Sequence, residues 1–158
     1  MSKAFIRKAT SQDLNSILKL LESILALHHS GRPDIFRNAG SKYTYEELEN
    51  IISGEKTPVF VADDANGTIL GYAFCIEKEI GNNALQDRKI LYLDDLCVDE
   101  TKRGSGTGKL LMEHIKKYAK EINADNLELN VWNFNKQAIS FYEHMGFTVQ
   151  KSTMEIKL

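Results

Sequence analysis

Hydrophobic residues recur along the first part of the chain either every two residues or about every 3.6 residues. The change from one period to the other separates strands from helices. The alternation over residues 4–9 predicts a first strand. Thr10 or Ser11 then suits the N-cap of an amphipathic helix. The apolar side of this helix has the spacing i, i+3, i+4, i+7 and i+11 and consists of Leu14, Ile17, Leu18, Leu21 and Leu25.

The segment after this helix, His28–Arg37, is polar and aromatic, and Gly31 and Pro33 break any helix there. We therefore predict an irregular stretch, of the kind in which ligand contacts are often found. Thr44 and Glu47 have the spacing of a capping box, which predicts a short helix over 45–52.

The remaining pattern predicts further strands and helices in alternation. Residues 58–63 and 68–79 read as two strands, and the short turn over 64–67 requires them to be antiparallel. The order predicts a single α+β domain over 1–158, with a mixed, mainly antiparallel sheet and helices on both faces. The later expected elements are an exposed loop over 80–89, a central strand over 90–98, a helix over 109–122, a strand over 127–132, a helix over 136–144 and a final strand over 147–158.

The composition is that of an ordinary globular protein, with 42% hydrophobic and 27% charged residues and a net charge of −2. No basic stripe interleaved with aromatic residues runs along the sequence, so we do not expect a nucleic-acid partner. No apolar run approaches the roughly 18 residues that span a bilayer, and we expect a cytoplasmic protein without a membrane partner. Cys75 and Cys97 lie in apolar runs without metal-ligand spacing, so we expect core cysteines and no metal.

The segment Arg103–Gly108 joins the predicted central strand to the helix over 109–122. Glycines at this place let backbone N–H groups converge on one point, and the helix dipole favours an anion there. We therefore expect the segment to bind phosphate.

Two common phosphate loops do not fit this segment. A Walker-type loop aligned on Gly108 and Lys109 would need a glycine at Arg103 and a metal-binding hydroxyl at Leu110. A dinucleotide fingerprint begun at Gly104 or Gly106 would need its third glycine at Lys109 or Leu111. The sequence thus argues against both metal-bound nucleotides and nicotinamide cofactors.

Three motifs together resemble the acyl-CoA-dependent N-acyltransferases of the GNAT superfamily, from about Phe5 to the C-terminus. Arg103, Gly106 and Gly108 have the spacing of that family's pyrophosphate loop, Arg/Gln-x-x-Gly-x-Gly/Ala. The segment 92–98 resembles its central strand. The second family motif is resembled by Asn135, Ala138, Tyr142 and the pair Gly146-Phe147.

The resemblance implies that acetyl-CoA is the co-substrate and that a primary amine attacks its thioester directly, in a ternary complex. It also implies that the central strand and the next strand splay apart, so that pantetheine amides pair with strand backbone, as a peptide does at a sheet edge. The residues that the resemblance assigns to the cofactor are Leu96, Cys97, Val98, Arg103, Gly104, Ser105, Gly106, Thr107, Gly108, Lys109, Asn135 and Tyr142.

The attacking amine must be neutral, so a base is required, and Asp94 and Asp95 are the candidates. Carboxylates inside an apolar strand are costly unless they are paired or reached by solvent. Because successive strand side chains face opposite sides, we expect only one of the two to face the acetyl group. The string 92–95 resembles the Tyr-Leu-Glu-Asp of polyamine acetyltransferases, which implies that Asp94 is a water-mediated base and that Asp95 meets the substrate. The alternative is that one of them is a structural carboxylate.

Tyr142 holds the position from which this family protonates the departing thiolate. The alternative is a helix tyrosine packed in the core beside Phe141. The wall of the acceptor site in this family falls between the first two helices, which here implies His28, His29, Arg32, Asp34 and Phe36.

We therefore expect an N-acetyltransferase that acts on a small molecule or a peptide. The alternatives are a non-catalytic acyl-CoA sensor or structural module, and an interaction protein that shares only the fold. The acidic pair Asp94 and Asp95 would favour a cationic amine, although a peptide amine remains open. Homodimers are common in the family and are one expectation for this chain.

Overall fold

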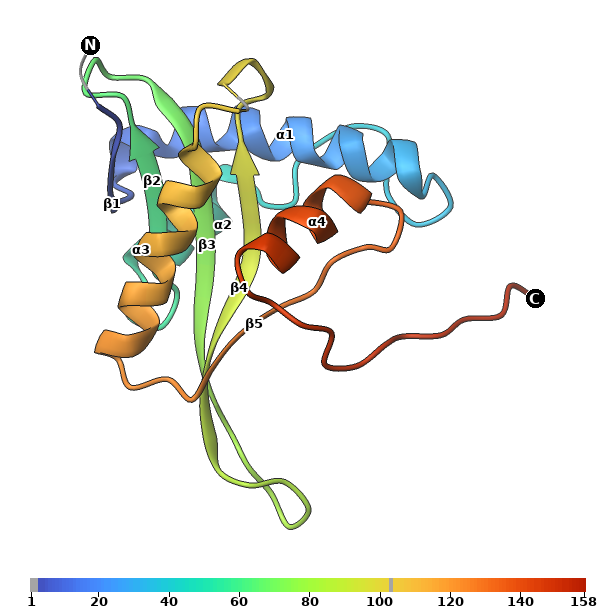
Figure 1. Cartoon of the computed structure of the whole chain (residues 1–158). Coiled ribbons are helices and arrows are strands. Elements are labelled where there is room, and N and C mark those ends of the chain that lie inside the picture. The colour runs from blue at the N-terminus through green and yellow to red at the C-terminus, as the bar shows by residue number, and fades with distance from the viewer. Residues whose placement is uncertain (1–2, 103) are drawn as a thin grey trace.

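The computed structural model describes residues 3–102 and 104–158, and within them it forms one five-stranded sheet flanked by four α-helices (Figure 1). The strand order is the order along the chain. Successive strands pair antiparallel, except that the last pair is parallel. The α+β prediction with a mixed, mainly antiparallel sheet is confirmed. The strands are β1 (Phe5–Lys8), β2 (Val59–Asp63), β3 (Ile69–Ile80), β4 (Arg88–Val98) and β5 (Asn126–Leu129).

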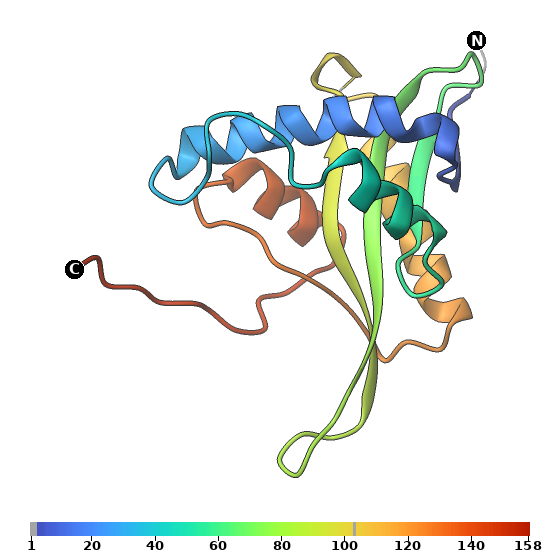
Figure 2. The same cartoon turned by 180° about the vertical axis from the view of Figure 1, so that it is seen from behind.

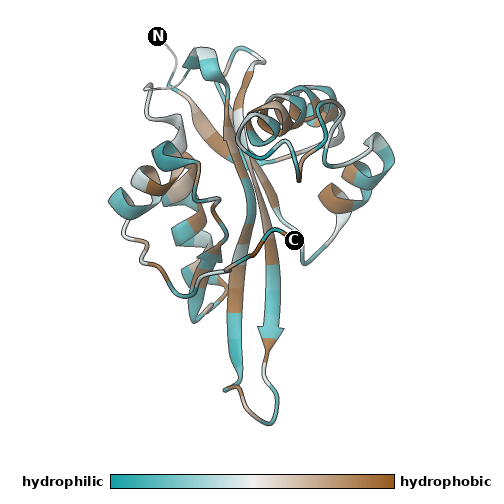
Figure 3. Ribbon diagram, turned by 90° about the vertical axis from the view of Figure 1, so that its right-hand side faces the viewer, coloured by the Kyte–Doolittle hydropathy of each residue, from teal (hydrophilic) through white to brown (hydrophobic). Residues whose placement is uncertain are grey.

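Helices cover both faces of the sheet, as predicted. In Figure 2 the helices α1 (Leu14–Gly31) and α2 (Tyr45–Ser53) lie in front of the sheet, with α3 (Thr107–Glu121) behind it. The helix α4 (Lys136–His144) packs on the same apolar cluster as α3. Figure 3 shows hydrophobic stretches along the strands between these layers, while the projecting end of the β3–β4 hairpin is hydrophilic.

The first helix begins at a network of charged groups. Thr10 and Asp13 form a capping box around a short 3-10 turn, Ser11–Asp13. Arg7 on β1 donates hydrogen bonds to both Asp13 carboxylate oxygens, at 2.8 and 2.9 Å, and to Asp63 on β2 at 3.0 Å. One guanidinium therefore ties the start of α1 to two strands, which compensates for burying Asp13.

The end of α1 differs from the expectation. We predicted an irregular segment from His28, but the helix continues through Gly31 and ends two residues before Pro33. A glycine is tolerated in the last turn of a helix, and here it also permits close packing, because a side chain at Gly31 would collide with the ring of Phe134. His28 and His29 are thus held on a helix.

The predicted splay of the central strands is confirmed. β4 pairs with β5 only over Ile90–Leu93 and then continues to Val98, paired on its other side with β3. We predicted that the strand after α3 would extend to Trp132, but β5 ends at Leu129. The chain turns away there because Trp132 packs against Phe36 beyond the end of α1, with ring centroids 5.2 Å apart.

The prediction of a final strand over 147–158 is wrong for the structure of the single chain. These residues are extended but form neither helix nor strand in the structure, and they run away from the body of the protein (Figures 1 and 2). Two side-chain contacts guide the segment, from Gln150 to Glu128 at 2.9 Å and from Arg32 to Glu155 at 2.7 Å.

Candidate active site

The two neighbouring carboxylates Asp94 and Asp95 lie on the same side of the sheet. The register of β4 shifts against β3, so that Asp95 is opposite Phe74 and Leu93 is opposite Cys75. Asp94 is the extra residue of this β-bulge, which breaks the alternation of side chains. The alternation on which we based the expectation that only one of the two acids faces the acetyl group is therefore broken here, and which of them faces that group stays a prediction.

Two tyrosines show where the acids point. The Tyr43 hydroxyl donates a hydrogen bond to Asp94 at 2.7 Å, and the Tyr72 hydroxyl donates one to Asp95 at 2.9 Å. Both tyrosine rings pack against Phe74, with centroids 5.6 and 4.9 Å away, on the face that α1 and α2 cover. A carboxylate pair is thereby assembled from one strand and fixed by phenols from two other segments.

Asp94 is also bound to a cation from its own chain. The Lys42 ammonium lies 2.8 Å from Asp94 Oδ2, the oxygen that also accepts the Tyr43 hydrogen bond. Burial and the negative charge of Asp94 raise the pKa of Tyr43 well above its usual range, so Tyr43 remains a donor. A primary amine thus already occupies a position beside Asp94.

Asp95 lies deep in the protein but keeps partial contact with solvent. Burial raises its pKa to about 6, against the opposing effects of the Lys42 charge and the Tyr72 hydrogen bond. The carboxyl can therefore take up and release a proton near neutral pH, which is the property of a general base.

Tyr142 projects from α4 toward the same region. Its ring packs between Phe141 and Phe147, at centroid distances of 5.4 and 5.7 Å. Burial and then the negative charge of Asp95 raise the pKa of Tyr142 far above neutrality. The phenol is thus protonated at pH 7 and lies within electrostatic reach of Asp95, on the other side of the splay between β4 and β5.

The glycine segment lies at the end of β4 and opens α3. Gly104 and Gly106 have φ angles of 82° and 84°, in the left-handed region that favours glycine. Gly104, Ser105 and Gly106 are exposed, whereas Thr107 is buried and hydrogen bonded to Ser105 at 2.9 Å. The first-turn amides of α3 follow directly, where helix geometry leaves N–H groups without internal partners. Arg103 lies outside the described residues.

The start of α3 also borders the splay. A side chain at Gly108 would stand 3.4 Å from the Phe141 ring of α4 and 3.7 Å from Val98 of β4. The glycine segment, α4 and the part of β4 beyond its pairing with β5 therefore meet at one place. Lys109 is exposed on the first turn of α3.

The side chains of the β4 segment over 96–98 divide between the two faces. Leu96 and Val98 pack into the cluster under α3, whereas Cys97 is buried against α1 and its thiol donates a hydrogen bond to the Leu20 carbonyl at 3.7 Å. Any contact from Cys97 to a ligand in the splay would therefore use its backbone. Both cysteines are buried as expected, and burial raises the pKa of the Cys75 thiol to about 12.

Asn135 has a structural role in α4. Its side-chain oxygen accepts a hydrogen bond from the Ala138 amide at 3.1 Å, which makes it the N-cap of the helix. The cap fixes the helix that carries Tyr142. Contact between Asn135 and a cofactor stays a prediction.

The predicted acceptor residues do come together, at the end of α1. His28 packs on Phe36 with ring centroids 4.8 Å apart, and His29 Nδ1 is hydrogen bonded to the Phe36 carbonyl at 2.8 Å. Burial and then the charge of Lys42 lower the pKa of His28, so His28 lies within electrostatic reach of the lysine that binds Asp94.

The charged members of this group are paired with one another. Arg32 binds Asp34 at 2.8 Å, and its guanidinium lies 5.9 Å from the centre of the Trp132 ring. Trp132 is 38% exposed and also contacts Phe36. An aromatic wall thus joins the end of α1 to the segment that follows β5.

Sequence reasoning missed Lys42 and Tyr72 as members of the site. A lysine before a helix cap resembles any surface residue, and a tyrosine on an apolar strand resembles core. The only available signal was the unexplained pair of acids on β4, which requires polar partners somewhere in the fold.

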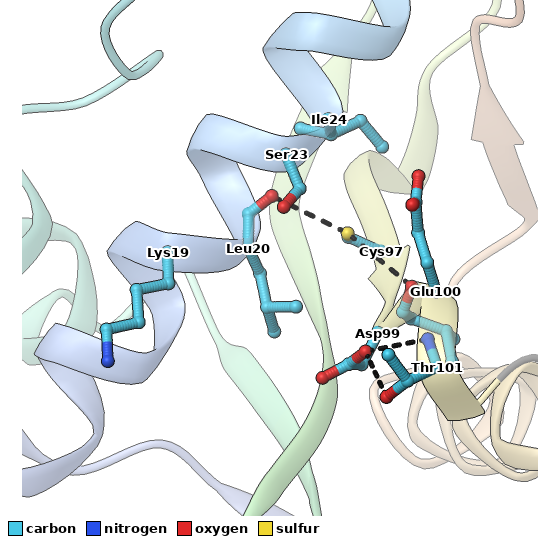
Figure 4. A pocket seen from close by; sticks show the side chains of 9 residues that line it. Lys19, Leu20, Ser23, Ile24, Cys97, Asp99, Glu100 and Thr101 are labelled. Carbon is cyan, nitrogen blue, oxygen red and sulfur yellow. Dashed lines mark hydrogen bonds between the residues drawn. The ribbon is translucent and has the colours of Figure 1, made fainter.

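A cavity of about 260 Å³ lies beside the end of β4, between α1 and the residues that lead into the glycine segment (Figure 4). Figure 4 shows the Thr101 amide and hydroxyl donating to Asp99 and the Cys97 thiol pointing to Leu20. Among the residues that the structure describes, neither Asp94 nor Tyr142 nor any of 104–108 lines this cavity. Its lining residues are Lys19, Leu20, Ser23, Ile24, Cys97, Val98, Asp99, Glu100 and Thr101.

Two further kinds of site were sought in the part of the chain that the structure describes. Among residues 3–102 and 104–158, no three His, Cys, Asp or Glu side chains gather where they could hold a metal ion. In the same ranges, none of the helices combines the length and the apolar character needed to cross a membrane.

Comparison with known sequences identifies relatives. The sequence profile of the acetyltransferase (GNAT) family matches residues 21–147. Streptothricin acetyltransferase from Streptomyces lavendulae is 38% identical over 88 residues, which are 56% of this chain and 43% of that protein. Peptidyl-lysine N-acetyltransferase YjaB from Salmonella typhimurium is 41% identical over 58 residues, 37% of either chain. This chain thus matches less than half the length of these curated relatives.

Solved structures match over almost the whole chain. A tetramutant of the BH1408 protein from Bacillus halodurans is 37% identical with a TM-score of 0.94, and the match covers 98% of this chain and 99% of that one. An aminoglycoside acetyltransferase from a soil metagenome, meta-AAC0020, has a TM-score of 0.74 at 19% identity, covering 98% and 95% of the two chains. At that identity the second match shows a common fold.

Proposed function

Because this chain belongs to the acetyltransferase (GNAT) family, we propose that it is an N-acetyltransferase and that it moves an acetyl group from acetyl-CoA to a primary amine by direct attack in a ternary complex. One observation carries the proposal. A buried acid with a pKa of about 6, Asp95, and a protonated phenol, Tyr142, lie within electrostatic reach of each other beside the splay between β4 and β5.

The residues present fit a CoA diphosphate and its pantetheine arm. Backbone amides of the segment 104–108, of which residues 104–106 are exposed, would bind the diphosphate at the N-terminus of α3. The edge of β4 beyond Leu93 faces no strand in the described part of the chain and would pair with the pantetheine amides. When bound there, acetyl-CoA supplies the thioester carbonyl that the amine attacks. Arg103 and Asn135 are further candidates for this site.

We assign different tasks to the two acids. Asp95 would take the proton from the attacking amine, directly or through water, because its pKa is near neutrality and its charge acts on Tyr142. Asp94 would hold the acceptor as an ammonium ion, in the position that Lys42 occupies now. This reverses the order that the polyamine acetyltransferases imply. Tyr142 would donate its proton to the departing sulfur.

The acceptor class follows from the charge of the site. Asp94 and Asp95 favour a cationic amine, and the wall formed by His28, Phe36 and Trp132 offers apolar surface beside it. The relatives named for streptothricin and for peptidyl lysine support an amine acceptor. A small polyamine or an aminoglycoside fits best, with a peptide lysine as the other candidate. Assembly into a homodimer and a cytoplasmic location are part of the same proposal.

A two-stage experiment tests the proposal. Calorimetry with acetyl-CoA first measures binding, and mass spectrometry then measures acetylation in a panel of polyamines, aminoglycosides and lysine peptides. We expect binding and acetylation of at least one cationic amine. Binding without acetylation of any amine would indicate an acyl-CoA sensor, and no binding would contradict the site itself.

A further inference from the structure

The segment between α1 and α2 carries a primary amine into the candidate active site. Residues 32–44 form neither an α-helix nor a strand, and they lead from the end of α1 to the start of α2 (Figure 2). Lys42 lies near the end of this segment, and its ammonium is 2.8 Å from Asp94 Oδ2. The Lys42 side chain is 43% exposed, whereas that of Asp94 is 18% exposed. The amine is therefore held by the carboxylate and still open to solvent.

The surroundings of Lys42 place its amine close to the groups that we assign to catalysis. The next residue, Tyr43, donates a hydrogen bond to the same oxygen of Asp94, and the Lys42 ammonium lies 5.3 Å from the centre of the Tyr43 ring. Burial raises the pKa of Asp95, and the charge of Lys42 opposes this effect. The amine thus lies within electrostatic reach of the proposed base.

The segment around Lys42 is built in a way that lets the amine move. Gly40 has a φ angle of 109°, with open space where a side chain would stand. The Ser41 hydroxyl is buried and has no hydrogen-bond partner among the residues that the structure describes. A buried hydroxyl without a partner costs free energy, so this conformation is weakly held at Ser41. The lysine stem is itself flexible, and a short movement can bring the amine from Asp94 to the acetyl group.

We propose that Lys42 is itself a substrate of this chain: its Nζ is acetylated by acetyl-CoA bound to the same molecule, and the acetylated side chain leaves Asp94 free for an external cationic amine. This inference rests on the proposed function, because it uses the same base, the same acid and the same acetyl donor. It goes further because the first acceptor is part of the protein. An amine held by its own chain has the high effective concentration of an intramolecular reactant.

The reaction balances without a further reactant. The Lys42 ammonium gives one proton to Asp95, directly or through water, and the neutral amine forms a C–N bond with the acetyl carbon. The C–S bond breaks, and the thiolate of CoA takes the proton of Tyr142. Tyr142 recovers a proton from the new amide nitrogen through water, and Asp95 releases its own to solvent. The products are Nζ-acetyl-lysine, the CoA thiol and one proton.

Acetylation would change the charge of the acceptor region. Lys42 would lose its positive charge and with it the ion pair to Asp94, while Asp94 would keep the hydrogen bond from Tyr43. An external ammonium could then bind Asp94 without displacing an internal one. The internal amine is thus an occupant of the site that the first turnover removes.

Mass spectrometry of the full chain tests the self-acetylation. Incubated with acetyl-CoA and no external amine, the natural chain should gain one acetyl group, which peptide mapping places on Lys42, with a rate constant independent of protein concentration. Lys42→Arg keeps the positive charge and should gain no acetyl group at this position. Asp95→Asn should lower the rate about 100-fold or more. Circular dichroism confirms that both variants fold.

Lys117 is the matched comparison within the same protein. It is 77% exposed and lies 3.8 Å from Glu121 on α3, so uncatalysed acetylation by acetyl-CoA would reach it at least as easily as Lys42. Equal acetylation of Lys42 and Lys117 would overturn the proposal, and so would a rate constant that rises with protein concentration. If the chain acetylates an external amine but leaves Lys42 unmodified, self-acetylation is wrong and the proposed function stands. If neither Lys42 nor any external amine is acetylated, the proposed function fails as well.

n-Butylamine tests whether Lys42 holds the place of the acceptor, because it reproduces the lysine side chain without the backbone. Lys42→Ala empties this place, whereas Lys42→Arg keeps it filled. With acetyl-CoA present, Lys42→Ala should acetylate n-butylamine about fivefold or more faster than Lys42→Arg, in line with the loss of one competing ion pair. Lys117→Ala should match the natural chain. Equal rates for Lys42→Ala and Lys42→Arg would contradict the proposal.

Discussion

At the scale of single residues, the surroundings of Asp94 and Asp95 explain how two adjacent carboxylates come to differ. A bulge puts both on one face, and a lysine and a phenol then satisfy Asp94, while Asp95 is more deeply buried and bonded to Tyr72. Burial raises the pKa of Asp95 to about 6, so in a fraction of the molecules Asp95 is still protonated near neutral pH. Substitution of either acid should therefore have distinct consequences.

Asp95→Asn should lower kcat by about 100-fold or more, which is the usual loss on removing a general base. In the natural enzyme kcat/KM should fall as the pH drops through about 6, because protonated Asp95 accepts no proton. Asp94→Asn should act chiefly on the KM of the amine. Steady-state kinetics from acid to neutral pH measure both, and a loss of kcat confined to Asp94→Asn would reverse the two roles.

The substitution Asp95→Asn should also stabilise the folded protein at alkaline pH. Asp95 binds its proton more tightly when folded than when unfolded, so the folded state loses stability as the pH rises through about 6. Asp95→Asn removes this loss and should gain about 1–2 kcal/mol at pH 8, below the full linkage value because Asp95 keeps some solvent contact. Thermal unfolding at pH 8 and pH 4 measures the difference, which should be small at pH 4. Asp87→Asn, on an exposed loop, is the control. An equal gain in the stability of this variant would show that the raised pKa of Asp95 is not the cause.

Tyr142→Phe should lower kcat by about 10- to 100-fold while the melting temperature changes little, since the ring keeps its contacts with Phe141 and Phe147. Tyr118→Phe is the matched control. It removes the hydrogen bond from Tyr118 to Glu77 at 2.6 Å and should cost about 1 kcal/mol of stability without changing kcat. Full activity of Tyr142→Phe would leave Tyr142 as a packing residue only.

At the scale of elements, the glycine segment shows how a loop conformation prepares a binding site. Its two positive φ angles precede α3, and residues 104–106 are exposed beside the place where α4 and β4 meet. Gly67 in the β2–β3 turn has nearly the same conformation, with φ at 88° and open space around it, but lies apart from the site. Comparing substitutions at Gly106 and at Gly67 therefore distinguishes the effect of backbone strain from the effect on ligand binding.

Gly106→Ala should raise the KM and the dissociation constant for acetyl-CoA by about tenfold or more, because the added carbon strains the turn and lies where the diphosphate would approach. Gly67→Ala should lose a similar amount of stability, about 1 kcal/mol, and leave acetyl-CoA binding unchanged. Calorimetry with acetyl-CoA compares the two. Equal binding by both variants would show that this segment does not hold the diphosphate.

Elements also show what the sequence could and could not predict. The β2–β3 hairpin, α2 and α4 depend on local periodicity and caps, and they lie within one or two residues of the prediction. The end of β5, the bulge at Asp94 and the unpaired segment over 147–158 depend on contacts between distant segments. The partners of Asp94 were hidden for the same reason, since Lys42 is brought to it only by the fold. Patterns of single residues carry no such information.

At the scale of the whole molecule, the glycine segment, α4 and the two acids on β4 all lie around the splay between β4 and β5. It separates β5 from the part of β4 beyond Leu93, which carries the two acids and ends near the start of α3. To the start of α3, the part of β4 beyond Leu93 and the acids on that part we assign, in our proposal, the diphosphate, the pantetheine arm and the base.

The central claim is that acetyl transfer takes place between Asp95 and Tyr142. Mass spectrometry of a cationic amine panel, incubated with acetyl-CoA and either the natural enzyme or Asp95→Asn, tests it most directly. We predict rapid acetylation by the natural enzyme and a loss of about 100-fold or more in the variant, with acetyl-CoA affinity retained. Acetylation at equal rates by both proteins would contradict the account.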